Sequence, residues 1–248
     1  MMLTASPFCM RKFTLCRIGS VVSGPGSISE TSSSEIIVSS VMRFIFFILL
    51  AVVGSASGAV AQEKTVPTVL IFGDSIVAGY GLKPEEILTV RLQSIMEQKG
   101  HHVSIINAGV SGDTTSGGRA RLAWTLKKHH PAVVVLAIGG NDLLRGLPPA
   151  LTRENLTAML DELKAQKIKV ILSAVQAPPS FGVAFAAEFN KIYPELAQKY
   201  DVPLYPFLLE KTFGQATLMQ KDQIHPNAQG AELIAQALAD YLIKNRLP

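Results

Sequence analysis

Residues 67–76 read PTVLIFGDSI, and this stretch decides the fold. Its first six residues form a short apolar run containing β-branched side chains, as in a strand that is buried on both faces. A glycine ends the run, and the polar residues Asp74 and Ser75 follow at once. Four more runs of this kind follow along the chain, at 102–107, 132–138, 168–175 and, more weakly, 203–207.

Segments with helical spacing separate these runs. In the segment 85–99, apolar residues recur every three or four positions, and Gly100 ends the pattern, as glycine commonly ends helices. Further helices are predicted around Leu122 and Leu126 and at 155–166, 184–199 and 228–244. Strands that alternate with helices form a parallel sheet covered on both faces. The sequence therefore predicts a single α/β domain with a five-stranded parallel sheet.

The composition excludes several classes of protein. With 48% hydrophobic and 17% charged residues, this chain of 248 residues is not a disordered one. Its formal net charge of +4 is small and scattered, which argues against a nucleic-acid partner. Both cysteines, Cys9 and Cys16, lie near the start, so the sequence after them can hold neither a disulfide nor a cysteine-based zinc site.

The front of the chain differs in character from the rest. Residues 1–41 are rich in serine and show no sustained period, and we expect a mis-called or disordered extension there. Met42 and an arginine then precede the apolar run FIFFILLAVV, which is too short to span a bilayer. Small residues ending at Ala61 complete the layout of a secretory signal peptide. We predict a signal peptide at 42–61, cleavage near Ala61, and a periplasmic or secreted domain at 62–248 without a stable membrane anchor.

The residues just after each predicted strand carry the candidate chemistry, because open parallel sheets bind ligands beyond the carboxyl ends of their strands. Ser75 is the candidate nucleophile, and it needs a base to take its proton. His225 is the candidate base, and Asp222, three residues earlier, can accept its imidazole N–H and orient the ring. Taken singly, each also has a structural explanation, because a serine after a strand commonly caps a helix and Pro226 can start one.

Acyl transfer also needs hydrogen-bond donors for the oxyanion of the tetrahedral intermediate. The candidates are the N–H of Ser75, the N–H of Gly112 in a glycine-containing loop, and the side-chain amide of Asn141. The structural alternatives are a tight turn at Gly112 and a loop cap at Asn141. We expect Asp74 and Asp142 to hold the loops through hydrogen bonds rather than to carry protons.

Apolar residues after two further strand ends are candidates for substrate binding. They are Leu143, Leu144, Pro178, Pro179 and Phe181. Loop packing explains the same residues equally well. The other histidines come as adjacent pairs, at 101–102 and 129–130, without the i, i+4 spacing of a common zinc site. We therefore expect no metal and no cofactor, and the sequence leaves the oligomeric state open.

The blocks that contain these residues resemble those of the SGNH, or GDSL, hydrolase family. The matching blocks are 73–76 (GDSI), Gly112, 140–142 (GND) and 222–225 (DQIH). The longer segments NAGVSGDTT at 107–115 and GGNDLLRG at 139–146 look like the bacterial periplasmic branch of arylesterases, thioesterases and lysophospholipases. The resemblance runs from about residue 67 to residue 239. Two positions depart from the family pattern, Ile76 and Gln223, and neither carries chemistry.

This resemblance implies a flavodoxin-like three-layer α/β/α sandwich, the SGNH hydrolase fold. It also implies a catalytic triad of Ser75, His225 and Asp222, and an oxyanion hole formed by Ser75, Gly112 and Asn141. The expected partner is a small-molecule ester or thioester. The function that follows is that of a secreted serine esterase for small to medium acyl and aryl esters, with thioesters and lysophospholipids as further candidates.

The same residues exclude two other folds and leave two other functions open. An α/β-hydrolase needs G-x-S-x-G, but Val77 occupies the position of the second glycine, and such enzymes place Asp and His far apart in sequence. A dinucleotide-binding loop fails because Pro84 follows Gly79 and Gly81. A carbohydrate O-deacetylase or acyltransferase on the same scaffold stays open, as does a ligand-binding module that has no catalytic activity.

Overall fold

The apolar runs predicted as strands form one sheet in the computed structural model, which describes residues 66–246. The strands are β1 (Thr68–Gly73), β2 (Ser104–Gly109), β3 (Val133–Ala137), β4 (Lys169–Ser173) and β5 (Leu204–Tyr205). All neighbouring strands are parallel, in the order β2-β1-β3-β4-β5. This is the strand order of flavodoxin-like folds, so the predicted fold class is confirmed. The predicted extension at 1–41 and signal peptide at 42–61 lie outside the described residues.

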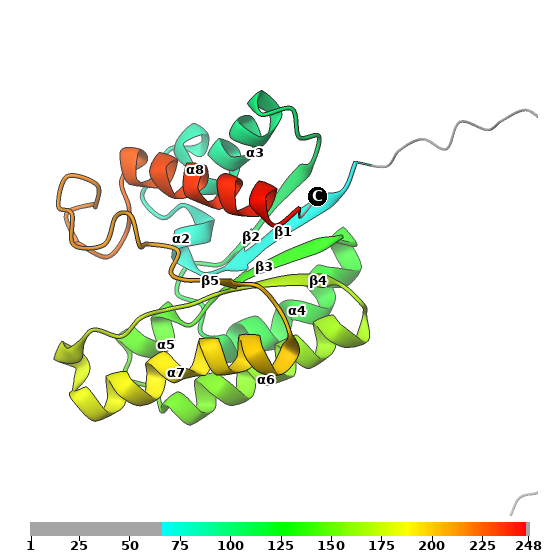
Figure 1. Ribbon diagram of the computed structural model, residues 1–248. Helices are drawn as coiled ribbons and strands as arrows, with labels where there is room; N and C mark the ends of the chain where they lie inside the picture. Colours follow the sequence, from blue (N-terminus) through cyan, green and yellow to red (C-terminus); the bar gives the residue numbers. More distant parts are fainter. Residues whose placement is uncertain (1–65, 247–248) are drawn as a thin grey trace, which may run out of the picture. The chain divides into compact units, whose positions relative to one another are not determined.

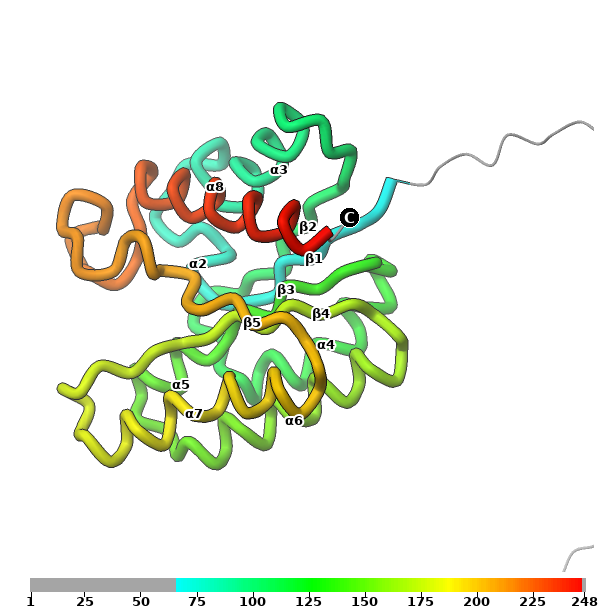
Figure 2. Tube along the Cα trace, viewed as in Figure 1, coloured from blue at the N-terminus to red at the C-terminus, as the bar shows by residue number. Residues whose placement is uncertain are grey.

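Helices cover both faces of the sheet and give the domain three layers (Figures 1 and 2). One layer contains α2 (Ser75–Ala78), α3 (Leu88–Gln98) and α8 (Ala228–Lys244). The other contains α4 (Thr115–His129), α5 (Gly140–Leu144), α6 (Pro149–Ala165) and α7 (Val183–Tyr200). Two short 3-10 turns, η1 (Pro84–Glu86) and η2 (Pro179–Phe181), precede α3 and α7.

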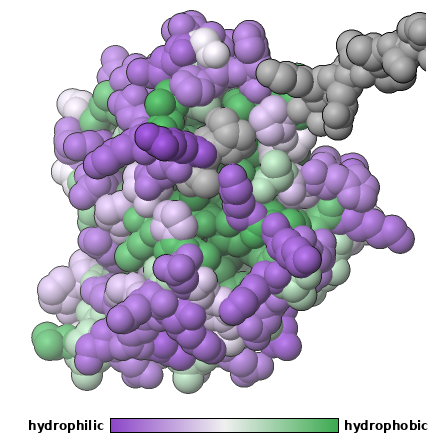
Figure 3. All heavy atoms as spheres, turned by 45° about the vertical axis from the view of Figure 1, so that its right-hand side comes forward, coloured by the Kyte–Doolittle hydropathy of each residue, from purple (hydrophilic) through white to green (hydrophobic). Residues whose placement is uncertain are grey.

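Each face of the sheet has its own hydrophobic core, because successive side chains of a strand point to opposite faces. In β1, Leu70 and Phe72 belong to the core under α4, α6 and α7, whereas Val69 and Ile71 belong to the core under α3 and α8. All four side chains are fully buried. On the face shown in Figure 3, hydrophilic residues predominate above and below, and hydrophobic residues are visible mainly in the middle of the view.

The helices agree with the predictions except at four places. The helix predicted at 85–99 is interrupted, because Ile87 is extended between η1 and α3 and its side chain occupies the space that a Cβ on Gly79 would need. α6 begins at Pro149, six residues before the predicted start, since proline suits the first turn of a helix. The short helices α2 and α5 were not predicted, because four or five residues show no measurable period.

The carboxyl ends of the strands lie along one edge of the sheet, on the left of Figure 1. The chain leaves β1 toward one helix layer and leaves β3, its neighbour, toward the other. Open α/β sheets bind ligands at such a switch point. Ser75 and Asn141 follow these two strands, so the topology places them at this position. Within residues 66–246, no helix is both long enough and apolar enough to cross a membrane.

Candidate active site

Ser75 is the first residue of α2 and lies directly beyond β1. The helix cap is Asp74, whose Oδ1 accepts a hydrogen bond of 3.1 Å from the N–H of Ile76. The helix ends after one turn at Gly79, which has a φ of 80° in the left-handed region that glycine tolerates. Because Asp74 supplies the cap, the hydroxyl of Ser75 is not needed for this local role.

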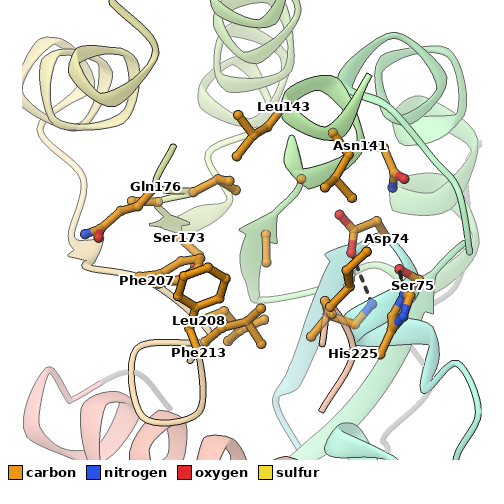
Figure 4. Close-up of a pocket in the computed structure, with 18 of the residues that line it drawn as sticks. Asp74, Ser75, Asn141, Leu143, Ser173, Gln176, Phe207, Leu208, Phe213 and His225 are labelled. Carbon is orange, nitrogen blue, oxygen red and sulfur yellow. Dashed lines mark hydrogen bonds between the residues drawn. The ribbon is translucent and has the colours of Figure 1, made fainter. Parts of the chain in front are cut away.

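His225 lies in the loop before α8 and faces Ser75 in the site (Figure 4). Its Nε2 is 2.9 Å from Oγ of Ser75, and its Nδ1 is 2.7 Å from Oδ2 of Asp222. The fold thus brings together two residues that are 150 positions apart in sequence. The imidazole can take a proton from Ser75 while Asp222 accepts the other N–H. The catalytic roles of these three residues stay predictions.

Hydrogen bonds keep the carboxyl group of Asp222 ionised. Partial burial alone would raise its pKa, but the His225 side chain and the N–H groups of Ile224 and His225 donate to it and lower the pKa from 3.8 to about 2. The carboxylate therefore stays negative through the neutral pH range. A negative charge at this position stabilises an imidazolium ion on His225.

The three predicted oxyanion donors come from three separate loops or helix starts. Asn141 lies in the first turn of α5, where its Nδ2 donates to the carbonyl of Asp113 at 2.9 Å and keeps a second N–H for a ligand. Gly112 has a φ of 79°, and Arg145 donates to its carbonyl at 2.9 Å. Between residues 66 and 246, no protein group accepts a hydrogen bond from the N–H of Ser75 or Gly112.

Buried polar contacts connect the loops that carry these donors. Asp142 is fully buried and accepts hydrogen bonds from both the N–H and the hydroxyl of Thr115. Arg121 pairs with Asp113 at 2.7 Å and donates to the carbonyl of Gly73 at 2.9 Å. Asp142 has the loop-holding role expected for it. Such networks fix the positions of the neighbouring backbone groups because each buried partner is costly to leave unpaired.

A pocket of about 200 Å³ opens beside Ser75 and His225. Its lining is mostly apolar, and it extends to one side of the two residues, toward Gln176, Phe207 and Phe213 (Figure 4). Four of the five predicted substrate-binding residues line it: Leu143, Leu144, Pro178 and Phe181. Pro179 does not line the pocket and instead starts the turn η2.

Several pocket residues were missed by the sequence analysis. Phe207, Leu208 and Phe213 form one wall, and the rings of Phe207 and Phe213 lie 5.9 Å apart in an edge-to-face contact. Ile76 and Ile224, each adjacent to a predicted catalytic residue, also line the pocket. The sequence does indicate the wall residues, because the loop after the last strand carries several large apolar residues that a solvated loop does not need.

Asp74 is an ionisable residue of the pocket lining. Its side chain is buried, and burial raises its pKa from 3.8 to about 6, although the hydrogen bond from Ile76 and the charge of His225 act in the opposite direction. The expected loop-holding role is visible in its capping contact with Ile76.

No three or more His, Cys, Asp or Glu side chains of residues 66–246 are arranged to hold a metal ion. The acidic side chains nearest Ser75 contact helix N–H groups, His225 or Arg121 instead.

Comparison with known proteins agrees with the sequence blocks and the geometry. The model of the GDSL-like Lipase/Acylhydrolase family matches residues 71–233. The chain belongs to this family. The predicted family is thereby confirmed, and with it the predicted enzyme class, that of hydrolases acting on carboxylic esters.

Named relatives of this GDSL-family chain include enzymes and solved structures. Esterase TesA of Pseudomonas aeruginosa is 39% identical over 165 residues, which are 66% of this chain and 82% of that protein. The thioesterase 1/protease 1/lysophospholipase L1 of Escherichia coli is 36% identical over 201 residues, which are 81% of this chain and 91% of that protein. The crystal structure of AlinE4, an SGNH-hydrolase family esterase, is 43% identical with a TM-score of 0.62, covering 74% of this chain and 97% of that one.

Proposed function

We propose that this GDSL-family protein is a secreted serine esterase that hydrolyses small to medium acyl and aryl esters, and that thioesters and lysophospholipids are further substrates. The observation that carries the proposal is the pair of hydrogen bonds at His225, 2.9 Å to Ser75 and 2.7 Å to Asp222, beside an apolar pocket. A serine hydroxyl in contact with an oriented imidazole is the arrangement that nucleophilic acyl transfer requires.

In the first half of the reaction, Oγ of Ser75 attacks the ester carbonyl carbon while Nε2 of His225 takes its proton. The carbonyl oxygen becomes an oxyanion that accepts hydrogen bonds from the N–H of Ser75, the N–H of Gly112 and the amide of Asn141. The imidazolium then gives its proton to the leaving oxygen, and the bond between that oxygen and the carbonyl carbon breaks. Ser75 is left acylated, and the alcohol departs.

In the second half, water replaces the alcohol. His225 takes a proton from the water as its oxygen attacks the acyl carbon, and the same donors stabilise the second oxyanion. The proton returns to Oγ of Ser75 as the carboxylic acid leaves. Asp222 stays ionised throughout, because its pKa is about 2, and it stabilises the imidazolium in both halves.

The pocket supports an acyl chain of limited length. It is mostly apolar, holds about 200 Å³ and is walled by residues such as Leu143, Phe207 and Phe213. An apolar chain gains free energy by leaving water for such a lining. Relatives named esterase TesA and thioesterase 1/protease 1/lysophospholipase L1 support the choice of ester and thioester substrates.

A para-nitrophenyl ester series of increasing acyl length tests the proposal directly. We expect the wild type to hydrolyse short and medium esters, and Ser75→Ala to lose about 10⁴-fold or more in kcat. Ser94→Ala, on the exposed side of α3, is the matched control and should keep wild-type turnover. A folded Ser75→Ala with wild-type turnover contradicts the nucleophile assignment. A wild type that binds esters without cleaving them identifies a binding module instead.

Export is a separate part of the proposal. It is supported by the positive residue, the apolar run and the small residues of segment 42–61. We expect N-terminal sequencing of the secreted protein to begin near Gln62. A secreted form that retains Cys9 contradicts the predicted cleavage.

A further inference from the structure

Tyr80 is an exposed aromatic residue in contact with the proposed catalytic base. The residue is 54% exposed, although it follows directly after the short helix α2 and its cap Gly79. The centres of its ring and of the His225 imidazole are 4.6 Å apart, and the two planes are inclined by 39°. The proposed mechanism assigns no task to this ring.

Hydrogen bonds connect the backbone of Tyr80 to Ser75 and to the loop that carries His225. Its N–H donates to the carbonyl of Ser75 at 3.1 Å. Its own carbonyl accepts a hydrogen bond of 2.7 Å from Nε2 of Gln220, which also donates to the carbonyl of Pro226 at 3.0 Å. These contacts link the residue of the nucleophile, through Tyr80, to the loop that carries His225. These bonds fix the backbone of Tyr80 beside the loop that carries His225, while much of the surface of Tyr80 stays exposed.

The apolar pocket beside Ser75 and His225, called the acyl pocket below because we propose that it holds the acyl chain, does not include the ring of Tyr80. In Figure 4 the labelled pocket residues Leu143, Phe207 and Phe213 lie to one side of Ser75 and His225. Tyr80 is not among the described residues that line the pocket. The imidazole thus has the acyl pocket on one side and contacts Tyr80 outside it.

The proposed reaction defines what must lie outside the acyl pocket. When the acyl chain fills the pocket, the leaving oxygen has to come within hydrogen-bond reach of Nε2 of His225, because it receives its proton there. The group attached to that oxygen therefore emerges past the imidazole and away from the pocket. The exposed ring that contacts the imidazole outside the pocket is that of Tyr80.

We infer that Tyr80 forms the leaving-group subsite and that it takes a planar aromatic group on the alcohol side of the ester. The inference rests on the proposed function, because it assumes that Ser75 and His225 cleave esters. Aromatic rings attract one another in offset or tilted contacts beyond the effect of their buried area. An aliphatic alcohol gains less from the same ring. The backbone contacts of Tyr80 also reduce the entropy that such a contact would otherwise cost.

Two esters with the same acyl group and different alcohols test this subsite in the full chain. Phenyl acetate carries an aromatic leaving group and ethyl acetate an aliphatic one. We expect Tyr80→Leu to lower the ratio of kcat/KM for phenyl acetate to kcat/KM for ethyl acetate by about three- to tenfold. Comparing this ratio between variants cancels the intrinsic reactivity of the two esters. Tyr80→Phe keeps the ring and should restore the wild-type ratio within about twofold.

Trp124→Leu is the matched control, because it removes another exposed aromatic ring, 64% exposed on α4 beside Lys128. We expect it to leave the ratio unchanged. An equal loss for both esters in Tyr80→Leu overturns the subsite, since it would mean that Tyr80 only holds His225. An unchanged ratio in an active Tyr80→Leu overturns it as well. A wild type that cleaves neither ester overturns the proposed function and the subsite together.

The acyl-enzyme offers a second measurement that does not depend on the starting ester. An alcohol that attacks acylated Ser75 enters through the subsite that the leaving group uses. We expect the ratio of benzyl acetate to acetic acid formed in the presence of benzyl alcohol to fall by about three- to tenfold in Tyr80→Leu. The corresponding ratio with ethanol should change less than about twofold. A preference for benzyl alcohol that survives in Tyr80→Leu contradicts the subsite.

Discussion

Asp222 shows how much of the proposed chemistry depends on one oriented charge. Its carboxylate accepts the Nδ1 hydrogen of His225 and two backbone N–H groups, which together hold the imidazole toward Ser75. Replacement by asparagine keeps the shape but removes the charge and can favour the wrong tautomer of His225. We expect Asp222→Asn to lower kcat for para-nitrophenyl acetate by about 10³- to 10⁴-fold. Steady-state kinetics on the folded variant measures this.

The control for this variant is another exposed aspartate in an ion pair. Asp240 on α8 pairs with Lys99 at 3.1 Å, and its side chain is 67% exposed. Exposed pairs of this kind contribute little, so Asp240→Asn should change kcat by less than about twofold. An Asp222→Asn enzyme that keeps more than about a tenth of wild-type turnover would contradict the assigned role of the carboxylate.

Asp74 makes a different prediction, which concerns the pH dependence of stability. Its pKa is about 6 in the folded protein and 3.8 as an ordinary aspartate, so the folded state binds the proton more tightly. The stability contributed by this group is fully present below about pH 4 and is lost as the pH rises through 6. Asp74→Asn keeps an oxygen for the N–H of Ile76 but removes the charge. The free energy of unfolding of Asp74→Asn minus that of the wild type should therefore rise by about 1–3 kcal/mol from about pH 4 to about pH 8.

Urea unfolding of both proteins at the two pH values measures this difference. The expected sign is specific, because loss of the capping contact alone would destabilise the variant equally at both pH values. A difference between the two proteins that does not change with pH would show that Asp74 is not buried as a charged group.

At the scale of elements, α8 could be predicted from the sequence, whereas α2 could not. α8 occupies the predicted residues, because Asn227 caps its start and an apolar stripe continues for four turns. α2 has four residues and no period, although it carries the proposed nucleophile. α2 is held by the cap at Asp74 and by close packing on β2. This packing joins segments that are far apart in sequence, so it leaves no local pattern. Ser75 could be singled out from the sequence as the candidate nucleophile, whereas the helix that positions it could not be predicted.

The packing of α2 on β2 leads to a prediction at Gly109. A Cβ at this position would lie 2.2 Å from the backbone nitrogen of Ala78 and 2.7 Å from the carbonyl carbon of Val77. Backbone atoms cannot rotate away, so Gly109→Ala must displace α2 and with it Ser75. We expect the variant to lose about 1–3 kcal/mol in free energy of unfolding and about 10- to 100-fold in kcat. Urea unfolding and ester hydrolysis measure the two effects.

Gly100 provides a control that separates packing from backbone strain. It follows α3 with a φ of 79°, and a Cβ there would meet nothing within 4 Å. Gly100→Ala should therefore lose about 1 kcal/mol in stability and leave kcat unchanged. If Gly109→Ala shows the same pattern, the contact between α2 and β2 does not position Ser75.

At the scale of the whole molecule, the sheet was predictable and the pocket only partly so. Strands buried on both faces produce apolar runs that can be read from the sequence, and residues after those runs must meet at one edge. That reasoning singled out Ser75 and Asn141 as candidates, whereas His225 stood out by its place between Asp222 and Pro226 before the last helix. The wall formed by Phe207 and Phe213 depends on how a long irregular loop folds back. This loop is held by contacts such as the hydrogen bond from Gln220 to the carbonyl of Tyr80, and no sequence pattern indicates such a contact.

The two hydrophobic cores on the faces of the sheet are built from residues between 69 and 243, and both cysteines, Cys9 and Cys16, precede them in the sequence. A chain that begins at Gln62 should therefore unfold at the same temperature as the full chain, with or without dithiothreitol. Its kcat/KM for para-nitrophenyl butyrate should agree within about twofold. In a domain of this size, a loss of about 1 kcal/mol lowers Tm by about 2–4 °C, which calorimetry resolves. A lower Tm in the shorter chain, or one that depends on the reductant, would mean that residues 1–61 stabilise the domain.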